Sequence, residues 1–150
     1  MSREDDIRAD IRDRLLATDE FQAVYPGSFE SHERPASDWR GAAIEPVSTH
    51  QIGGFDAALD GGFVYDMRVQ ITVAARVSGS YTRDRIAEHL LQVVKAALNG
   101  QNLADFTDGQ VTRITGWTWL PATDNERRIT AILTTQYIEE GWGAGDTDDP

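Results

Sequence analysis

The residues from Tyr65 to Gly79 alternate between apolar and polar side chains with almost no break. The apolar set occupies the odd positions Tyr65, Met67, Val69, Ile71, Val73, Ala75 and Val77. The polar set lies between them at Asp66, Arg68, Gln70, Thr72 and Arg76. Successive side chains of a strand point to opposite sides of its sheet, so this pattern predicts one long strand with an apolar and a polar face. The apolar face must pack against a core, and the polar face must contact either solvent or another molecule.

The composition is that of an ordinary globular domain. The chain has 150 residues, 40% of them hydrophobic and 26% charged, which suffices for a single core. Cysteine is absent, so disulfides, thiolate chemistry and cysteine-based zinc sites are excluded. The N-terminal "MSREDDIRAD" lacks the apolar core of a signal peptide, and no apolar run is long enough to span a bilayer. We therefore expect a protein of the cytoplasm or of released particles, with no membrane partner.

The charge balance argues against tight nucleic-acid binding. Fourteen basic residues against 25 acidic ones give a net charge of −11. Binding to a phosphate backbone depends on clustered lysine and arginine, which this chain lacks. An acidic surface is compatible, however, with DNA passing close by without sticking.

Two stretches have the helical period. In residues 5–17, Ile7, Ile11 and Leu15 recur at four-residue steps, and Ser2 is a candidate N-cap. A second helix is predicted from Arg83 to Asn99, with Thr82 as its cap and Gly100 at its C-terminal end. Its apolar face is formed by Ile86, Leu90, Val93, Val94, Ala97 and Leu98.

The remaining segments predict three further strands and one long loop. Residues 42–47 form a short strand that Pro46 ends or places at an edge, and residues 48–63, with two Gly-Gly pairs, form a loop. Residues 111–120 and 127–140 predict two more strands. The fold class expected is α+β with two layers: a mainly antiparallel sheet of about four strands, two helices on one face, and the other face uncovered. We expect one domain over residues 1–141, followed by a flexible acidic tail at 142–150.

No constellation of residues predicts catalysis, a metal or a cofactor. The three histidines, His32, His50 and His89, have no partner at metal-ligand spacing. The aspartates do not follow the EF-hand pattern, and "GGFDAALDGG" lacks the Gly-Lys-Ser/Thr ending of a phosphate loop. We expect a protein that is not an enzyme.

Trp117 and Trp119 lie two residues apart and so share one face of their strand. They either close the core or cap a sheet edge, or they form a contact surface, since tryptophan is enriched at the centres of interfaces. The polar face of the 65–79 strand presents the same choice between simple hydration and contact.

The layout resembles the tail terminator proteins of long-tailed bacteriophages, also called minor tail or tail completion proteins. The resemblance covers about residues 1–140. It lies in the helix "DDIRADIRDRLLA", the strand-helix unit "VYDMRVQITVAARV…RDRIAEHLLQVVKAAL" and the closing strand "RRITAILTTQYIEEG". The loop at 48–63 and the acidic tail have no counterpart in it.

The resemblance implies a homo-hexameric ring on the head-proximal end of the tail tube, which ends tube growth and joins the tail to the head. Its partners would be the major tail tube protein and a head-tail connector or stopper protein, with DNA crossing the ring unbound. Such a protein is assembled in the host cytoplasm and found in the virion. The residues facing the channel would be Asp66, Arg68, Gln70, Thr72 and Arg76, and a subunit or partner interface would include Phe55, Trp117 and Trp119. Two alternatives stay open: another neck component, or an unrelated α+β domain that binds a ligand at 48–63.

Overall fold

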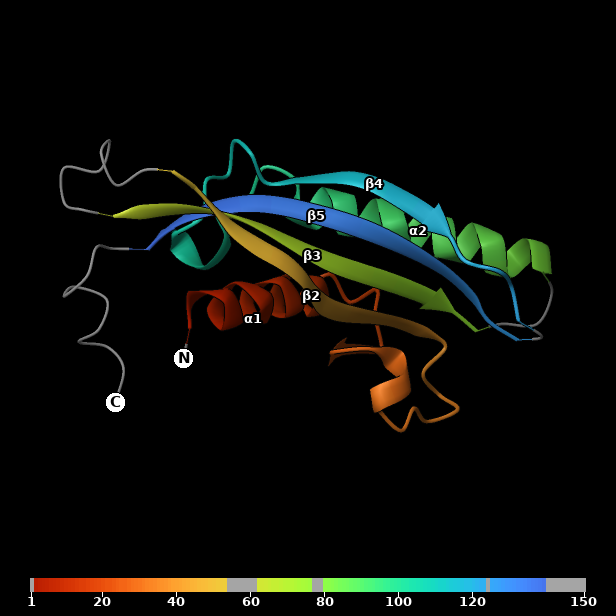
Figure 1. The fold of residues 1–150 in the computed structure, drawn as a ribbon. Helices are drawn as coiled ribbons and strands as arrows, with labels where there is room; N and C mark the ends of the chain where they lie inside the picture. The colour runs from red at the N-terminus through yellow and green to blue at the C-terminus, as the bar shows by residue number, and fades with distance from the viewer. Residues whose placement is uncertain (1, 54–61, 77–79, 124, 140–150) are drawn as a thin grey trace.

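The computed structural model describes residues 2–53, 62–76, 80–123 and 125–139. Its strands form one sheet in the order β1-β2-β3-β5-β4 (Figure 1). Only the β1–β2 pair is parallel, and the others are antiparallel. The expected α+β class is therefore confirmed. The strands are β1 (Ala23–Pro26), β2 (Arg40–Gly53), β3 (Phe63–Ala75), β4 (Arg113–Trp119) and β5 (Arg127–Glu139).

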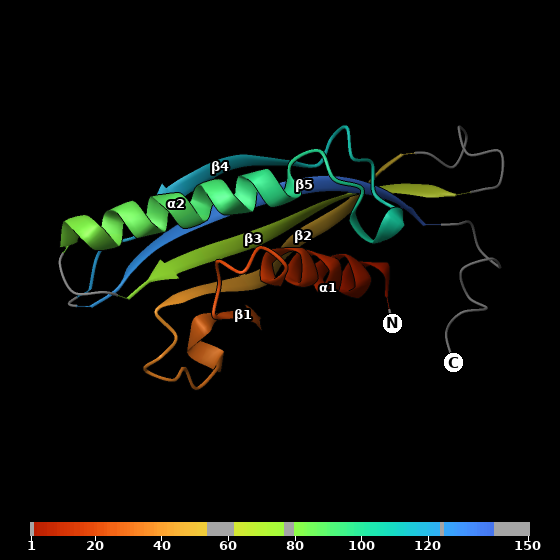
Figure 2. The ribbon, with the colours of Figure 1, turned by 180° about the vertical axis from the view of Figure 1, so that it is seen from behind.

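Helices α1 (Arg3–Leu16) and α2 (Ser80–Leu98) pack on the same face of the sheet, as expected (Figures 1 and 2). The predicted N-cap of α1 is confirmed, because the Ser2 hydroxyl accepts the Asp5 N–H at 3.1 Å. The predicted cap of α2 is wrong. The helix begins at Ser80, so Thr82 lies inside its first turn.

The core lies between the helices and the apolar face of β3. Every odd position from Met67 to Ala75 is buried and belongs to one cluster with α1 and α2. The prediction that the odd positions of β3 face the core is thus confirmed, whereas Thr72 and Ala74 on the other face are buried as well. Each fully buried valine, leucine or isoleucine of this layer contributes about 1.5–3 kcal/mol of hydrophobic stabilisation. The residues that carry the layer are Ile7, Ile11, Leu15, Met67, Val69, Ile71, Val73, Leu90, Leu98, Ile129 and Leu133.

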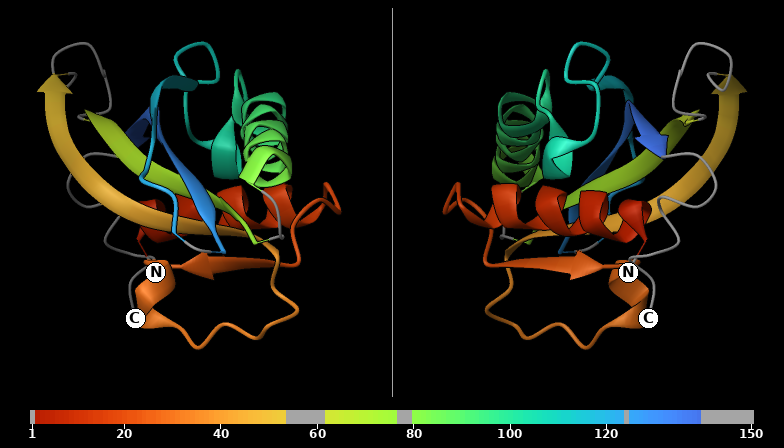
Figure 3. Two further views of the ribbon diagram at one scale, coloured as in Figure 1. Left: turned by 90° about the vertical axis from the view of Figure 1, so that its right-hand side faces the viewer. Right: turned by 90° about the vertical axis from the view of Figure 1, so that its left-hand side faces the viewer.

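Strand β2 corrects two expectations. It runs from Arg40 to Gly53, so the short strand at 42–47 is too short and the loop predicted at 48–63 is wrong for residues 48–53. Register shifts against β3 occur between Pro46 and Ser48 and between Gln51 and Gly53. Each shift inserts an extra residue, which breaks the alternation that sequence reading depends on. The strand also curves along its length (Figure 3).

The face of the sheet away from the helices is partly covered, contrary to expectation. Residues 27–39, which include the 3₁₀ turn Phe29–Ser31, pack over one end of it. Phe29 forms a second small core there with Ala43 and Ala74. The parallel strand β1 that leads into this segment was also not predicted, because its sequence reads as the approach to a turn.

Candidate assembly surface

The face of the sheet opposite the helices is mostly polar over β2, β3 and β5; we call it the polar face. Its side chains stand in rows across the three strands, because the register of both antiparallel pairs is continuous along β3 apart from the β2 bulges. The rows are His50–Asp66–Gln136, Ser48–Arg68–Thr134, Glu45–Gln70–Ile132 and Ala43–Thr72–Thr130.

Three of the five residues predicted to face a channel lie on this face in contact with solvent. Arg68 is exposed, whereas Asp66 and Gln70 are half-buried between neighbouring strands. Asp66 lies 3.7 Å from His50 and 4.0 Å from Arg68. Ion pairs at such exposed positions contribute about 0–1 kcal/mol and rearrange easily. The exposed part of the face therefore carries neighbouring charges of both signs.

The other two residues are placed differently. Thr72 is buried, and its hydroxyl lies 3.1 Å from that of Thr130, so it bonds across the strands. Arg76 lies just beyond β3, and its Nε donates to Glu126 at 3.0 Å. The structure thus leaves Asp66, Arg68 and Gln70 in contact with solvent on the polar face and buries Thr72. Arg76 keeps 26% of its side chain exposed, against 20% for Asp66, but it is paired with Glu126.

Glu126 is the centre of an ion-pair cluster that holds residues 27–39 on the sheet. It accepts hydrogen bonds from Arg34 at 2.7 Å, Arg76 at 3.0 Å and Arg128 at 2.6 Å. Arg34 also donates to Asp38 at 2.9 Å. The side chains of Arg34, Asp38 and Glu126 are 4%, 2% and 8% exposed, so these charges depend on one another for partners. We call these five residues the Glu126 cluster.

Burial and hydrogen bonding shift the pKa values in and beside this cluster. Burial alone would raise the pKa of Glu126, but hydrogen bonds and charges from Arg34 and Arg128 outweigh it and hold the pKa below its usual value. Burial raises the pKa of Tyr25, and its hydroxyl donates to Asp38 at 2.7 Å, which adds to the rise. Sequence reading missed the cluster. Arg34 and Asp38 have the i, i+4 spacing of an ion pair, but nothing local points to Glu126.

Trp117 and Trp119 lie at the free edge of the sheet. They stand opposite the buried Ala131 and Ile129, so they share the helix side of β4, and they are 46% and 37% exposed. The Nζ of Lys95 on α2 lies 4.3 Å from the ring centre of Trp117, and the Arg127 guanidinium lies 4.9 Å from that of Trp119. Both tryptophans therefore lie at the edge of the sheet and outside the core. Phe55 lies outside the described residues.

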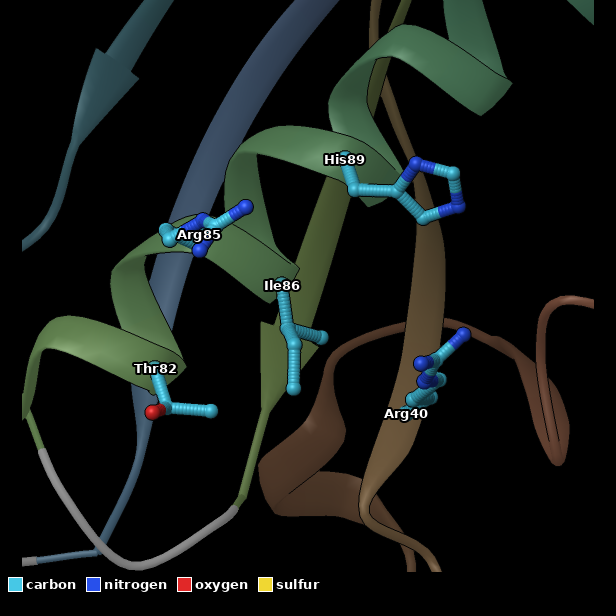
Figure 4. Close-up of a pocket in the computed structure, with 5 residues that line it drawn as sticks. All are labelled: Arg40, Thr82, Arg85, Ile86 and His89. Carbon is cyan, nitrogen blue, oxygen red and sulfur yellow. The ribbon is translucent and has the colours of Figure 1, made fainter.

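A hollow of about 260 Å³ opens beside the first turns of α2 and is lined by Arg40, Thr82, Arg85, Ile86 and His89 (Figure 4). Arg40 and His89 both bond the same Glu20 oxygen, at 2.9 and 3.0 Å. This arrangement ties β2 to α2 and contains no paired nucleophile and base.

Two features are absent from the described part of the chain. It contains no group of three or more histidine, cysteine, aspartate or glutamate side chains placed to hold a metal ion. None of its helices is long and apolar enough to cross a membrane.

Comparison with known proteins yields likenesses among solved structures alone. No protein-family model matches the chain, and no curated protein matches it. Among solved structures, the chain is similar to one in the "Virion of native gene transfer agent (GTA) particle", with 18% identity and a TM-score of 0.44. The match covers 91% of this chain and 97% of that chain. A TM-score this low does not establish a shared fold.

Proposed function

We propose that this protein is a structural component of a phage-type virion, forming a ring that closes the head-proximal end of a tail tube. The polar face carries the proposal. Outside the end that residues 27–39 cover, it is a solvent-facing sheet surface backed by the core, with side chains of both charges side by side. Together with the resemblance of the sequence to tail terminator proteins, it favours a wall for a channel over a site for a reaction.

The charges of the polar face suit a wall that DNA crosses without binding. Asp66 lies between His50 and Arg68, so no run of basic side chains faces outward there. Retention of DNA requires several phosphate contacts from lysine or arginine. With a net charge of −11, the whole chain repels the phosphate backbone instead. In this proposal Asp66, Arg68 and Gln70 line or border the channel.

The partners in this proposal are further copies of the chain, the major tail tube protein and a connector or stopper protein of the head. The exposed Trp117 and Trp119 belong to a subunit or partner interface, where large aromatic side chains contribute most. Because every subunit is strongly acidic, free copies repel one another. A tube end supplies a template that offsets part of the cost of ordering them.

Electron microscopy of tail tubes, with and without the purified protein, tests the proposal. We expect a six-fold ring on one end of each tube and arrested tube growth. The double variant Trp117→Ala/Trp119→Ala should cap fewer ends, whereas Glu88→Ala, an exposed change on α2, should cap as well as the parent.

Two results would contradict this function. Bare tube ends, together with a stable non-hexameric oligomer that is insensitive to salt, would remove the terminator role. A ring that binds connector proteins but ignores tube ends would instead identify another neck component.

A further inference from the structure

The free edge of β4 offers backbone hydrogen-bonding groups along its second half. Leu120 donates its N–H to Arg128 of β5 at 3.0 Å, so the neighbouring pair Trp119–Ile129 is of the non-hydrogen-bonded kind. These pairs alternate in an antiparallel ladder, so the N–H and C=O groups of Trp117 and Trp119 point away from β5. Counted along β5, the pair Ile114–Leu133 belongs to the same set, and the Ile114 N–H accordingly turns outward to the Asn99 side chain at 2.7 Å; a register shift between Ile114 and Gly116 moves the outward positions of β4 from even to odd numbers.

The first half of this edge is already covered. The side-chain oxygen of Asn99 accepts the N–H of Ile114, and the N–H of Gly100 donates to the Thr112 carbonyl at 2.8 Å. From Gly116 onward no described strand pairs with the outer edge of β4, and the three residues after Gly116 are exposed.

The opposite edge of the sheet is covered only along the first part of β2. There β1 covers β2 up to Ile44, whose carbonyl accepts the Gly27 N–H at 2.8 Å. The next residue of β2 whose backbone would face that edge is Pro46, which has no N–H to offer. A bulge follows directly, and bulges discourage pairing at an edge. Strand β4 also has a register shift, between Ile114 and Gly116, but its residues from Gly116 to Trp119 pair regularly with β5.

The side chains along the open half of β4 favour an acidic occupant. Lys95 makes no ion pair with any described residue, although it lies on the ring of Trp117. Arg127 lies on Trp119 and is paired with Asp84 at 3.3 Å. A strand added to β4 would place its own side chains about 4.5–5.5 Å from the tryptophans, within reach of these cations. A second copy of β4 would bring further cations instead, which disfavours self-pairing.

We propose that the Gly116–Trp119 edge binds an extended acidic segment of another protein, which joins the sheet antiparallel to β4. Its backbone would bond Trp117 and Trp119, and its carboxylates would lie on the helix side near Lys95. This inference does not depend on the ring, because a monomer already presents the complete edge.

Binding of a labelled synthetic peptide tests the inference. The probe is fluorescein-Thr-Glu-Thr-Glu-Thr-Glu-Thr-amide, with a matched peptide that has lysine for each glutamate. Fluorescence anisotropy should show binding of the glutamate peptide and at least about tenfold weaker binding of the lysine peptide. Lys95→Gln should weaken binding of the glutamate peptide about two- to fivefold, the range of one exposed charge pair. Arg68→Gln, which removes a cation from the polar face, should leave it unchanged.

N-methylation separates strand pairing from simple charge attraction. In an antiparallel pair the residues opposite Trp117 and Trp119 carry both the carboxylates and the N–H groups that bond β4. Methylating the glutamate nitrogens should therefore abolish binding, and methylating the threonine nitrogens should be tolerated. Equal effects of the two modifications, equal binding of both peptides, or an Arg68→Gln effect matching that of Lys95→Gln would each overturn the inference. Sedimentation of the protein alone as a dimer that Trp119→Ala dissociates would identify a second copy as the occupant.

Discussion

Neutralising the buried carboxylate of Glu126 should lower the free energy of unfolding substantially. The variant Glu126→Gln keeps the shape of the side chain but removes the charge that Arg34, Arg76 and Arg128 share. Removing one partner of a buried ion pair costs about 3–5 kcal/mol. Since the amide still accepts one or two hydrogen bonds, we expect the lower end, about 3 kcal/mol. For a domain of this size that is a fall of roughly 6–12 °C in the melting temperature.

The effect should depend on pH in a defined direction. The pKa of Glu126 in the folded protein lies below its ordinary value of 4.5, so the folded state holds the charged form more strongly than the unfolded state does. Its stabilisation is therefore complete above that value and is lost as the pH falls through the folded pKa. The stability difference between the parent and Glu126→Gln should be constant near neutral pH and shrink in acid.

Urea unfolding followed by circular dichroism, at a series of pH values, measures both quantities. Glu30→Gln is the matched control, because Glu30 also pairs with Arg128, at 3.0 Å, but its side chain is 69% exposed. It should cost no more than about 1 kcal/mol. If Glu126→Gln costs no more than Glu30→Gln, or if its cost persists unchanged in acid, the cluster does not hold residues 27–39 as argued.

Three other perturbations test the register, metal independence and assembly. Val69→Asp buries a charge beneath the helices and should prevent folding, whereas Gln70→Asp should give a normal circular dichroism spectrum; equal tolerance would mean that the strand register is wrong. A chelator should move the melting temperature by no more than a few degrees, and a large drop would reveal a metal site. In light scattering the dilute protein should be monomeric at low salt and associate more readily at high salt, because screening shortens the range of repulsion to about 10 Å at 0.1 M; oligomers insensitive to salt would contradict this.

The parts of the fold that follow from local periodicity could be read from the sequence. The alternation of β3 and the four-residue steps of α1 reflect burial along a single element, so Val69 and Ile11 were assigned to the core correctly. Strand β2 could be read only in part. Its two bulges each reverse the face of the following residues, so the segment after Pro46 no longer alternates.

The surface was harder to predict because its properties arise between distant elements. Thr72 has the polarity of an exposed residue, yet it is buried and bonds to Thr130 on β5. The Glu126 cluster joins three segments, and no spacing within one segment indicates it. Trp117 and Trp119 were correctly placed on one face. Whether that face was core or edge depended on the strand order, which places β4 last in the sheet.

The position of β5 means that the sheet can form completely only after the last strand of the chain has been synthesised. This strand lies between β3 and β4, although it follows both along the chain, and it pairs Ala75 with Arg127 and Phe63 with Glu139. Until β5 has left the ribosome, one edge of β3 in the β2–β3 hairpin is therefore unpaired, and β4 has no strand to pair with. Contacts between such distant segments make folding slow and leave strand edges open to other chains. Loss of β5 by premature termination would leave the sheet split in two, so the nascent chain is most prone to aggregate just before its last strand emerges.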